Sequence, residues 1–286
     1  RAQVSMVRDL LINKLGKPAA FADQGVVTLD PAVGTGTYPL GILQSVLESV
    51  PNHAAGSVPA LLRRAADNIY GIEYLIGPYS VAHLRLSRFL AEHGVKVESQ
   101  APFKILLADT LASHEVDDNA MLPEVFGYEQ ILEEREAARE LKVDTNVVVS
   151  IGNPPYLRGR KTDAGASAGG WVTMRRSPTK GQKVRDPVTR RMVADRGEIG
   201  ILKDFVEPAI AAGRGGDVKN LYNAYVYFWR WALWKVFEQE QGGADGSTLE
   251  SRAGIVSFIT ASSFLRGPGF VGMREHMRRH LDEIWI

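Results

Sequence analysis

Short apolar runs alternate along the chain with longer segments in which apolar residues recur every three or four positions. The short runs contain consecutive β-branched and aliphatic residues, which is typical of strands buried on both faces of a parallel sheet. They occupy positions 26–29, 69–72, 104–107, 147–151 and 254–259. The longer segments have helical periodicity and predict helices. They occupy positions 4–15, 37–50, 61–67, 79–90, 124–142, 201–212, 221–239 and 271–281.

This alternation of strand and helix predicts an α/β fold with a mostly parallel sheet and helices on both of its faces. The aromatic residues within 222–234 have helical spacing, which indicates core packing. A last apolar stretch at 283–286 predicts the first half of another strand. Because the chain also starts at Arg1 without a methionine, we expect residues 1–286 to be one domain cut from a longer polypeptide.

Composition narrows the class of protein. The chain has 286 residues, 45% of them hydrophobic and 23% charged, which is ordinary for a soluble globular protein. It has no cysteine, so disulfides and thiolate metal sites are excluded. Neither a membrane-length apolar run nor a signal peptide is evident, and we expect a cytoplasmic protein with no membrane partner.

One segment, 157–197, departs from the α/β pattern because it is rich in Gly, Ser, Thr and Pro and strongly basic. Such a long connection is either functional or mobile, and its charge suits contacts with nucleic acid phosphates. A solvated, disordered insertion is the alternative interpretation. The candidate DNA contacts are Arg158, Arg160, Lys161, Arg175 and Arg176. Outside this segment, Ser262, Ser263 and Arg266 follow a predicted strand and are further candidates.

The most informative motif is Asn153-Pro154-Pro155-Tyr156, directly after the apolar run at 147–151. Open α/β sheets bind ligands at the carboxyl ends of their strands. There Asn153 offers an amide oxygen, the two prolines hold a stiff turn with available carbonyls, and Tyr156 offers a flat ring for stacking. Together they form a socket for an exocyclic amine on a planar base, although a plain proline turn is also compatible with the tetrapeptide alone.

A glycine turn, Asp30-Pro31-Ala32-Val33-Gly34-Thr35-Gly36, joins the first predicted strand to its helix. Gly34 and Gly36 permit positive φ and a close approach of the backbone to a ligand. Asp30 at the strand end would repel a phosphate at short range but attract an ammonium group. The turn therefore favours a ligand with an amino acid end, such as S-adenosylmethionine, over a dinucleotide.

Two more carboxylates follow the next two strands. Glu73 ends the strand 69–72 and is placed to accept hydrogen bonds from ribose hydroxyls. Asp109 follows 104–107 and could accept from an adenine amino group, although a turn cap is an equal alternative. The four sites follow four successive strands, so a parallel sheet would place them along one edge.

These motifs, in this order, resemble those of the amino-methylating DNA methyltransferases of the N6-adenine class. The stretch from Asp30 through Pro31, Ala32 and Gly34 to Gly36 is similar to that family's first cofactor motif, and Glu73 and Asp109 to its ribose- and adenine-contacting acids. Asn153 to Tyr156 are similar to its catalytic tetrapeptide. The segments 221–229 and 254–260 look most like the methyltransferase module of large single-chain, type ISP-like restriction–modification enzymes. In place of the family's Thr-Pro start near the N-terminus, this chain has Gln3-Val4.

The resemblance implies a Rossmann-like class I S-adenosylmethionine-dependent methyltransferase fold, here without its last antiparallel strand. It implies transfer of a methyl group from S-adenosylmethionine to N6 of an adenine flipped out of double-stranded DNA, with no metal and no covalent enzyme intermediate. Asn153 would contact both cofactor and base. Further domains for target recognition, and a nuclease or helicase, are then expected elsewhere in a bacterial, nucleoid-associated parent chain.

Two rival functions remain open at this stage. A protein glutamine-N5 methyltransferase uses a similar Asn-Pro-Pro-Tyr socket for an amide nitrogen, although the Asp-Pro-Ala start and the basic segment favour DNA. A non-catalytic DNA-binding module is the second rival, which the intact acids and tetrapeptide disfavour. A cytosine-N4 enzyme would usually have Ser where Asn153 stands.

Overall fold

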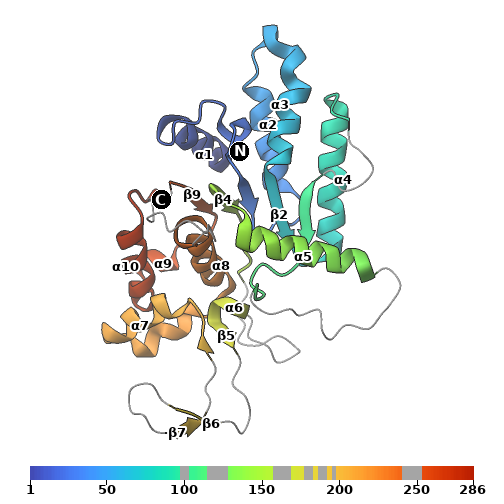
Figure 1. Ribbon diagram of the computed structural model, residues 1–286. Coiled ribbons are helices and arrows are strands. Elements are labelled where there is room, and N and C mark those ends of the chain that lie inside the picture. The colour runs from blue at the N-terminus through green and yellow to red at the C-terminus, as the bar shows by residue number, and fades with distance from the viewer. Residues whose placement is uncertain are drawn as a thin grey trace, which may run out of the picture. The chain divides into compact units, whose positions relative to one another are not determined.

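The computed structural model describes residues 1–96, 103–114, 128–156, 169–176, 183–185, 192–194, 198–239 and 253–286 (Figure 1). The chain divides into two compact units. The first comprises Arg1–Thr110, Asp117–Pro154 and Ala232–Ile259, and the second comprises Leu111–Val116, Pro155–Trp231 and Thr260–Ile286. The expectation of one methyltransferase domain with a basic insertion at 157–197 stays a prediction.

The first unit contains a five-stranded sheet with the order β3-β2-β1-β4-β9. Every pairing in this sheet is parallel among the described residues, which confirms the predicted parallel sheet. Its strands are β1 (Thr28–Asp30), β2 (Ile69–Glu73), β3 (Lys104–Leu107), β4 (Val149–Gly152) and β9 (Ile255–Phe258). Each lies within about two residues of a predicted apolar run.

Helices connect these strands and also lie close to the predicted positions. The α-helices are α1 (Ala2–Asn13), α2 (Thr37–Glu48), α3 (Val58–Asp67), α4 (Ile76–Glu92) and α5 (Tyr128–Asp144). Short 3₁₀ turns, η1 (Ala20–Ala22) and η2 (Asn52–Ser57), complete the connections. Among the described residues, no helix is both long enough and apolar enough to cross a membrane.

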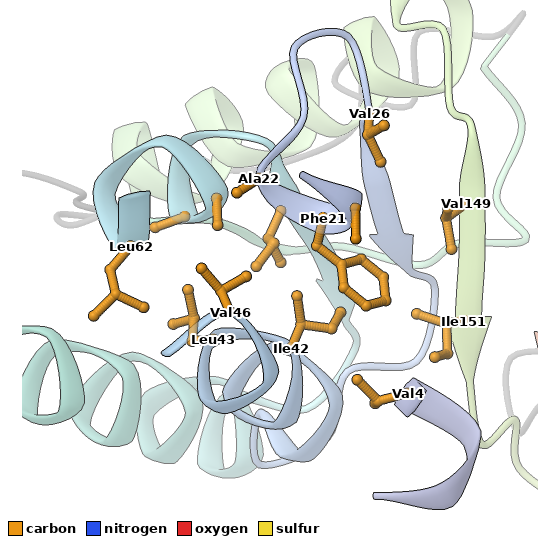
Figure 2. Close-up of a cluster of buried hydrophobic side chains, with 14 of the residues drawn as sticks. Val4, Phe21, Ala22, Val26, Ile42, Leu43, Val46, Leu62, Val149 and Ile151 are labelled. Carbon is orange, nitrogen blue, oxygen red and sulfur yellow. The ribbon is translucent and has the colours of Figure 1, made fainter. Parts of the chain in front are cut away.

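One face of the sheet is buried by a single apolar cluster (Figure 2). Val149 and Ile151 of β4 extend from the sheet into this cluster, where they meet Phe21 of η1. Ile42 of α2 and Val4 of α1 close it from the helical side. Burial of this apolar area stabilises the packing of the strands against the helices on this face.

The opposite face is buried as well, because the intervening strand residues Leu29 and Ile72 are fully covered. Helix α5 packs beside β3 and buries Ala138 and Leu141. Helices therefore cover both faces, as the strand–helix alternation predicted. The helix α5 is rich in charged residues, yet its Lys142 is only 3% exposed.

The second unit is mainly helical, with two antiparallel ribbons, β5–β8 and β6–β7. Its helical elements are α6 (Gly170–Thr173), α7 (Lys203–Ala211), η4 (Gly215–Leu221), α8 (Ala224–Leu233), α9 (Ser263–Arg266), η6 (Pro268–Phe270) and α10 (Val271–His280). Its short strands are β5 (Met174–Arg176), β6 (Lys183–Arg185), β7 (Met192–Ala194) and β8 (Glu198–Ile199). Arg230 is buried and binds the carboxylate of the partly exposed Asp204, so this unit contains a partly buried ion pair as well as aromatic packing.

Two sequence expectations are wrong. Residues 221–239 do not form one helix, because η4 ends at Leu221 and α8 gives way to a π-helical turn, η5 (Trp234–Glu238). Residues 283–286 form no strand; the side chain of Trp285 is 60% exposed and donates to Glu283 Oε2 at 3.0 Å. A short segment becomes a strand only when it pairs with the edge of a sheet. Among the described residues, 283–286 pairs with no sheet edge.

Two leucines test how much the buried cluster stabilises the fold. Leu62 is 1% exposed in α3, and Leu84 is 69% exposed in α4. We expect Leu62→Ala to lower the free energy of unfolding by about 2–5 kcal/mol, because it leaves a cavity. Leu84→Ala, the same change at a solvated position, should stay within about 0.5 kcal/mol of wild type. Denaturant unfolding followed by circular dichroism measures both, and equal losses would contradict the assigned core.

Candidate functional site

The sheet has its topological switch point at β1. Strands β2 and β3 lie to one side of β1, and β4 and β9 lie to the other. In open parallel sheets, the crevice for a ligand forms where the connections leave toward opposite sides, beyond the carboxyl ends of the strands. Here those ends are Asp30, Glu73, Leu107 and Gly152, so all four predicted site motifs start at one of these ends or within two residues of it.

The glycine turn at this edge has two positions whose backbone angles favour glycine. Gly34 has φ +55° and Gly36 has φ +77°, the left-handed region that other residues rarely adopt. A Cβ on Gly36 would also lie 3.2 Å from the Cα of Ala82, so α4 packs tightly against the turn. Gly36 then caps α2, which begins at Thr37. The turn therefore places a helix N-terminus, whose first backbone N–H groups have no partner within the helix, at this edge.

Glu73, at the end of the neighbouring strand β2, holds this turn in place by hydrogen bonds. Its Oε2 accepts from Gly34 N at 2.8 Å, and its Oε1 accepts from Leu75 N at 2.8 Å. From α4, Arg85 donates to the carbonyl oxygen of Thr35 at 2.7 Å and to its hydroxyl at 3.2 Å. The sequence indicated Glu73 but not Arg85, which has no motif of its own. The turn is consequently held in place by partners from two elements.

Asp30 is the most unusual charge of the site, because its side chain is almost entirely buried. Its Oδ1 accepts from Ala32 N at 3.1 Å, while its Oδ2 is buried with no hydrogen-bond partner. Burial raises the pKa of Asp30 to about 7, against the lowering effect of the Ala32 hydrogen bond and with a smaller raising effect from the negative charge of Glu73. A carboxyl oxygen in this state can accept a hydrogen bond from one more donor.

Asp109 lies at the same edge and is exposed. Two hydrogen bonds from side chains to backbone carbonyls hold its segment in place. The carbonyl oxygen of Asp109 accepts from Lys142 Nζ at 2.7 Å, and Thr110 Oγ1 donates to the carbonyl of Pro31. Lys142 is itself anchored, since its carbonyl accepts from Lys235 Nζ at 2.8 Å and from Gln239 Nε2 at 2.6 Å. Sequence reasoning missed both lysines, because a lysine side chain is almost never fully buried unless it has a partner, and no local pattern marks such a partner.

The tetrapeptide leaves β4 at the edge of the sheet. Ile259 N donates to the carbonyl of Gly152 at 3.1 Å, so β9 supports the start of the tetrapeptide. Asn153 is exposed and Pro154 is buried in the first unit. Pro155 and Tyr156 belong to the second unit, where the ring of Tyr156 is 46% exposed and its centroid lies 6.3 Å from that of Tyr225. Asn153 and Tyr156 thus both present polar or planar groups to solvent.

Gln3 is a further residue whose role sequence reasoning missed. Its Nε2 donates to the carbonyl of Ser257 at 2.8 Å and to the Ser257 hydroxyl at 3.0 Å, and its Oε1 accepts from Tyr38 O–H at 2.6 Å. One amide therefore fastens α1 to β9 and to α2. This explains how α1 is held although Gln3-Val4 replaces the expected Thr-Pro start.

Most predicted DNA contacts fall outside the part of the chain that the structure describes. Arg158, Arg160 and Lys161 are in this group. Arg175 and Arg176 belong to β5, but their side chains also lie outside the description. Arg266 is described and exposed at the end of α9. Within the described residues there is no group of three or more His, Cys, Asp and Glu side chains that could hold a metal ion.

Comparisons with known proteins bear on the fold. No protein-family model and no curated protein sequence matches the chain. Among solved structures, a nuclease-deletion mutant of the Type ISP restriction–modification enzyme LlaGI with a DNA substrate mimic matches 96% of this chain at 19% identity and a TM-score of 0.62. The ATP-dependent Type ISP enzyme LlaBIII bound to DNA matches 96% at 23% identity and 0.62. A DrdV–DNA complex matches 98% at 24% identity and 0.60.

At these identities the likeness concerns the fold, which this chain shares with one segment of each large protein. The chain spans 18%, 15% and 21% of the LlaGI, LlaBIII and DrdV chains, respectively. The α/β fold predicted from the strand–helix alternation is therefore confirmed by its likeness to one segment of each of these structures.

The buried carboxyl group of Asp30 predicts a pH-dependent stability. Its pKa is 3.8 in a model peptide and about 7 in the fold, so the native chain keeps a proton that the unfolded chain loses as the pH rises between these values. The free energy of unfolding should therefore fall with rising pH over this window, by up to about 4 kcal/mol relative to Asp30→Asn. Urea unfolding at pH 4.5 and 7.5 measures the difference. The exposed carboxylate variant Asp109→Asn is the matched control, and a fall unchanged in Asp30→Asn would contradict the assignment.

Proposed function

We propose that this chain transfers a methyl group from S-adenosylmethionine to N6 of an extrahelical adenine in DNA, as the methyltransferase module of a restriction–modification enzyme. The observation that carries the proposal is the buried Asp30 carboxyl group with its unpartnered Oδ2, beside a glycine turn at the switch point of a parallel sheet. Such a group fits an ammonium ion at the end of a ligand whose remainder follows the same edge.

The residues at this edge fit S-adenosylmethionine by their chemistry. Asp30 Oδ2 would receive the ammonium group of the methionine end, which supplies the partner that this buried oxygen otherwise lacks. Glu73 uses each carboxylate oxygen once, for Gly34 N and Leu75 N, and each keeps a second lone pair for a ribose hydroxyl. Asp109 is exposed where the adenine end would lie. When bound, this cofactor supplies an electrophilic methyl group on a sulfonium.

The acceptor side of the proposal rests on the tetrapeptide. An adenine amino nitrogen is a weak nucleophile, because its lone pair is delocalised into the ring. The amide oxygen of Asn153 and the carbonyl of Pro154 would each accept a hydrogen bond from one of its two N–H groups. These bonds would localise the lone pair on the nitrogen. Tyr156 would stack on the base and return about 1–3 kcal/mol of the cost of extruding it from the duplex.

Two features support DNA rather than a protein amide as the acceptor. The LlaGI, LlaBIII and DrdV structures are complexes with DNA or with a DNA mimic. The sequence of 157–197 is basic, which suits phosphate contacts. Both features concern the substrate class, while the tetrapeptide chemistry is the same for adenine and for a glutamine side chain.

The deciding experiment measures transfer of tritium from methyl-labelled S-adenosylmethionine to plasmid DNA and to whole-cell protein by the full-length polypeptide. Label in DNA that digestion releases as N6-methyl-2′-deoxyadenosine supports the proposal. Label in protein alone would establish the glutamine methyltransferase instead. Cofactor binding without transfer to either would point to a non-catalytic module.

The first functional prediction concerns Asn153. We expect Asn153→Ala to reduce methyl transfer at least about 100-fold, because positioning and electrostatics supply the rate enhancement. Cofactor affinity, measured by calorimetry, should stay within about threefold, since most cofactor contacts come from Asp30 and Glu73. Asn13→Ala, at an exposed helix end, is the matched control. A collapse of cofactor affinity in Asn153→Ala would mean that the residue serves binding rather than transfer.

A second prediction concerns pH. Because the ionised form of Asp30 is the one that pairs with an ammonium group, cofactor affinity should rise by about tenfold per pH unit below the pKa of about 7. Asp30→Asn should bind more weakly and lose this dependence between pH 5.5 and 7. Calorimetric titrations across that range test it, with Asp23→Asn as a control at a loop carboxylate. An identical pH profile in Asp30→Asn would remove Asp30 from the ammonium site.

A further inference from the structure

Tyr225 occupies a central place in the second unit. It is 3% exposed near the start of α8, where Tyr225 N lies 3.4 Å from Asn223 Oδ1. Its ring centroid lies 6.3 Å from that of Tyr156 and 6.4 Å from that of Phe270, with the Phe270 ring stacked at 24°. Its hydroxyl group shares a hydrogen bond of 3.0 Å with the hydroxyl of Ser263. One buried side chain therefore contacts the exposed ring of Tyr156 and the first residue of α9.

The segment that Tyr225 holds, Ser263–Arg266, is also fixed at its other end. Arg274 of α10 donates to the carbonyl of Phe264 at 2.7 Å and to that of Gly267 at 2.9 Å. Partial burial and the positive charge of Arg278 lower the pKa of Arg274. A Cβ on Gly267 would lie 2.7 Å from the Phe270 ring, so this turn is too tightly packed for a side chain at position 267.

What this segment presents to solvent is polar and basic. Ser262, Ser263 and Arg266 are all exposed, and among the described residues the Arg266 side chain has no ion-pair or hydrogen-bond partner. A stacked base and its own phosphate are joined by a single sugar. A protein that binds both therefore needs its stacking ring and its phosphate-binding groups at a fixed spacing.

We propose that Tyr225 is a positioning residue, which holds the ring of Tyr156 and the Ser263–Arg266 segment as one binding surface for the extrahelical base and its flanking phosphates. This inference rests on the proposed function and names the part of the chain that receives the acceptor strand. The hydroxyl of Tyr225 is the critical group, because the ring alone would fill the core equally well. Its bond to an exposed serine links the aromatic packing under Tyr156 to the segment that carries Arg266.

The test uses the full-length chain with three variants, Tyr225→Phe, Ser263→Ala and the double variant. The matched control is Tyr222→Phe, at a tyrosine that is 36% exposed and lies three positions earlier in the sequence. The two single variants remove the same hydrogen bond from opposite sides. Each should raise KM for duplex DNA about fivefold, which corresponds to the net contribution of one neutral hydrogen bond. Each should leave kcat and cofactor affinity within about twofold of wild type. The double variant should be no worse than either single variant.

A spectroscopic readout tests the positioning role apart from catalysis. With 3-fluorotyrosine incorporated at position 156, the ¹⁹F resonance should shift or broaden in Tyr225→Phe and in Ser263→Ala, but not in Tyr222→Phe. Ser263 is exposed, so Ser263→Ala should fold normally even if Tyr225→Phe does not. An unchanged ¹⁹F resonance in Ser263→Ala, additive KM effects in the double variant, or an equal effect of Tyr222→Phe would overturn the inference.

Failure of the proposed function would look different. Wild-type protein that transfers no label to DNA would refute the methyltransferase proposal itself. The role of Tyr225 is then decided by the ¹⁹F resonance together with the dissociation constant for duplex DNA of wild type against Ser263→Ala. A weaker complex with a shifted resonance supports the positioning role, and no change in both overturns it.

Discussion

The parallel pairing of β1 with both β2 and β4 is the constraint on which the candidate site depends. A strand with a neighbour on each side cannot turn back along the sheet, so the chain must leave it at Asp30 and enter a helix directly. That departure is short, which is why the turn needs positive φ at Gly34 and Gly36. The apolar cluster behind β1 and β4 fixes the strands, and the edge in front stays available for polar groups.

The charges at this edge are arranged by the same geometry. Glu73 accepts from two backbone N–H groups, whereas Asp30 accepts from one and leaves its second oxygen unpaired in a buried position. Desolvation therefore raises the pKa of Asp30, and the nearby negative charge of Glu73 raises it further. The two carboxylates of this edge therefore differ in their surroundings, since Glu73 fixes backbone and Asp30 keeps an unpaired oxygen. Under the proposed function, this difference would place the ammonium end of the ligand at β1 and its ribose at β2.

The sequence predicted those parts that rest on local pattern. The strands of the sheet and the helices α1 to α4 follow from apolar periodicity, and the glycine turn with Glu73 follows from motif spacing. What it missed depends on contacts distant in sequence. Lys142 and Lys235 meet across 93 positions, and Gln3 reaches Ser257 across 254, so no local pattern marks them. The strand expected at 283–286 failed for a related reason, since a strand exists only through its neighbour.

Tyr225 illustrates why burial and function should not be treated as alternatives. Its position in an aromatic run at helical spacing indicates core packing, and the structure confirms that it is buried together with Tyr227, Phe228 and Trp231. Yet the aromatic core predicts nothing about a hydroxyl group, and a tyrosine whose O–H were buried without a partner would cost stability. The hydroxyl finds its partner on the exposed Ser263 rather than inside the core. A phenylalanine would have met the packing requirement alone, so the hydroxyl is the feature that connects the core to the surface beside Tyr156.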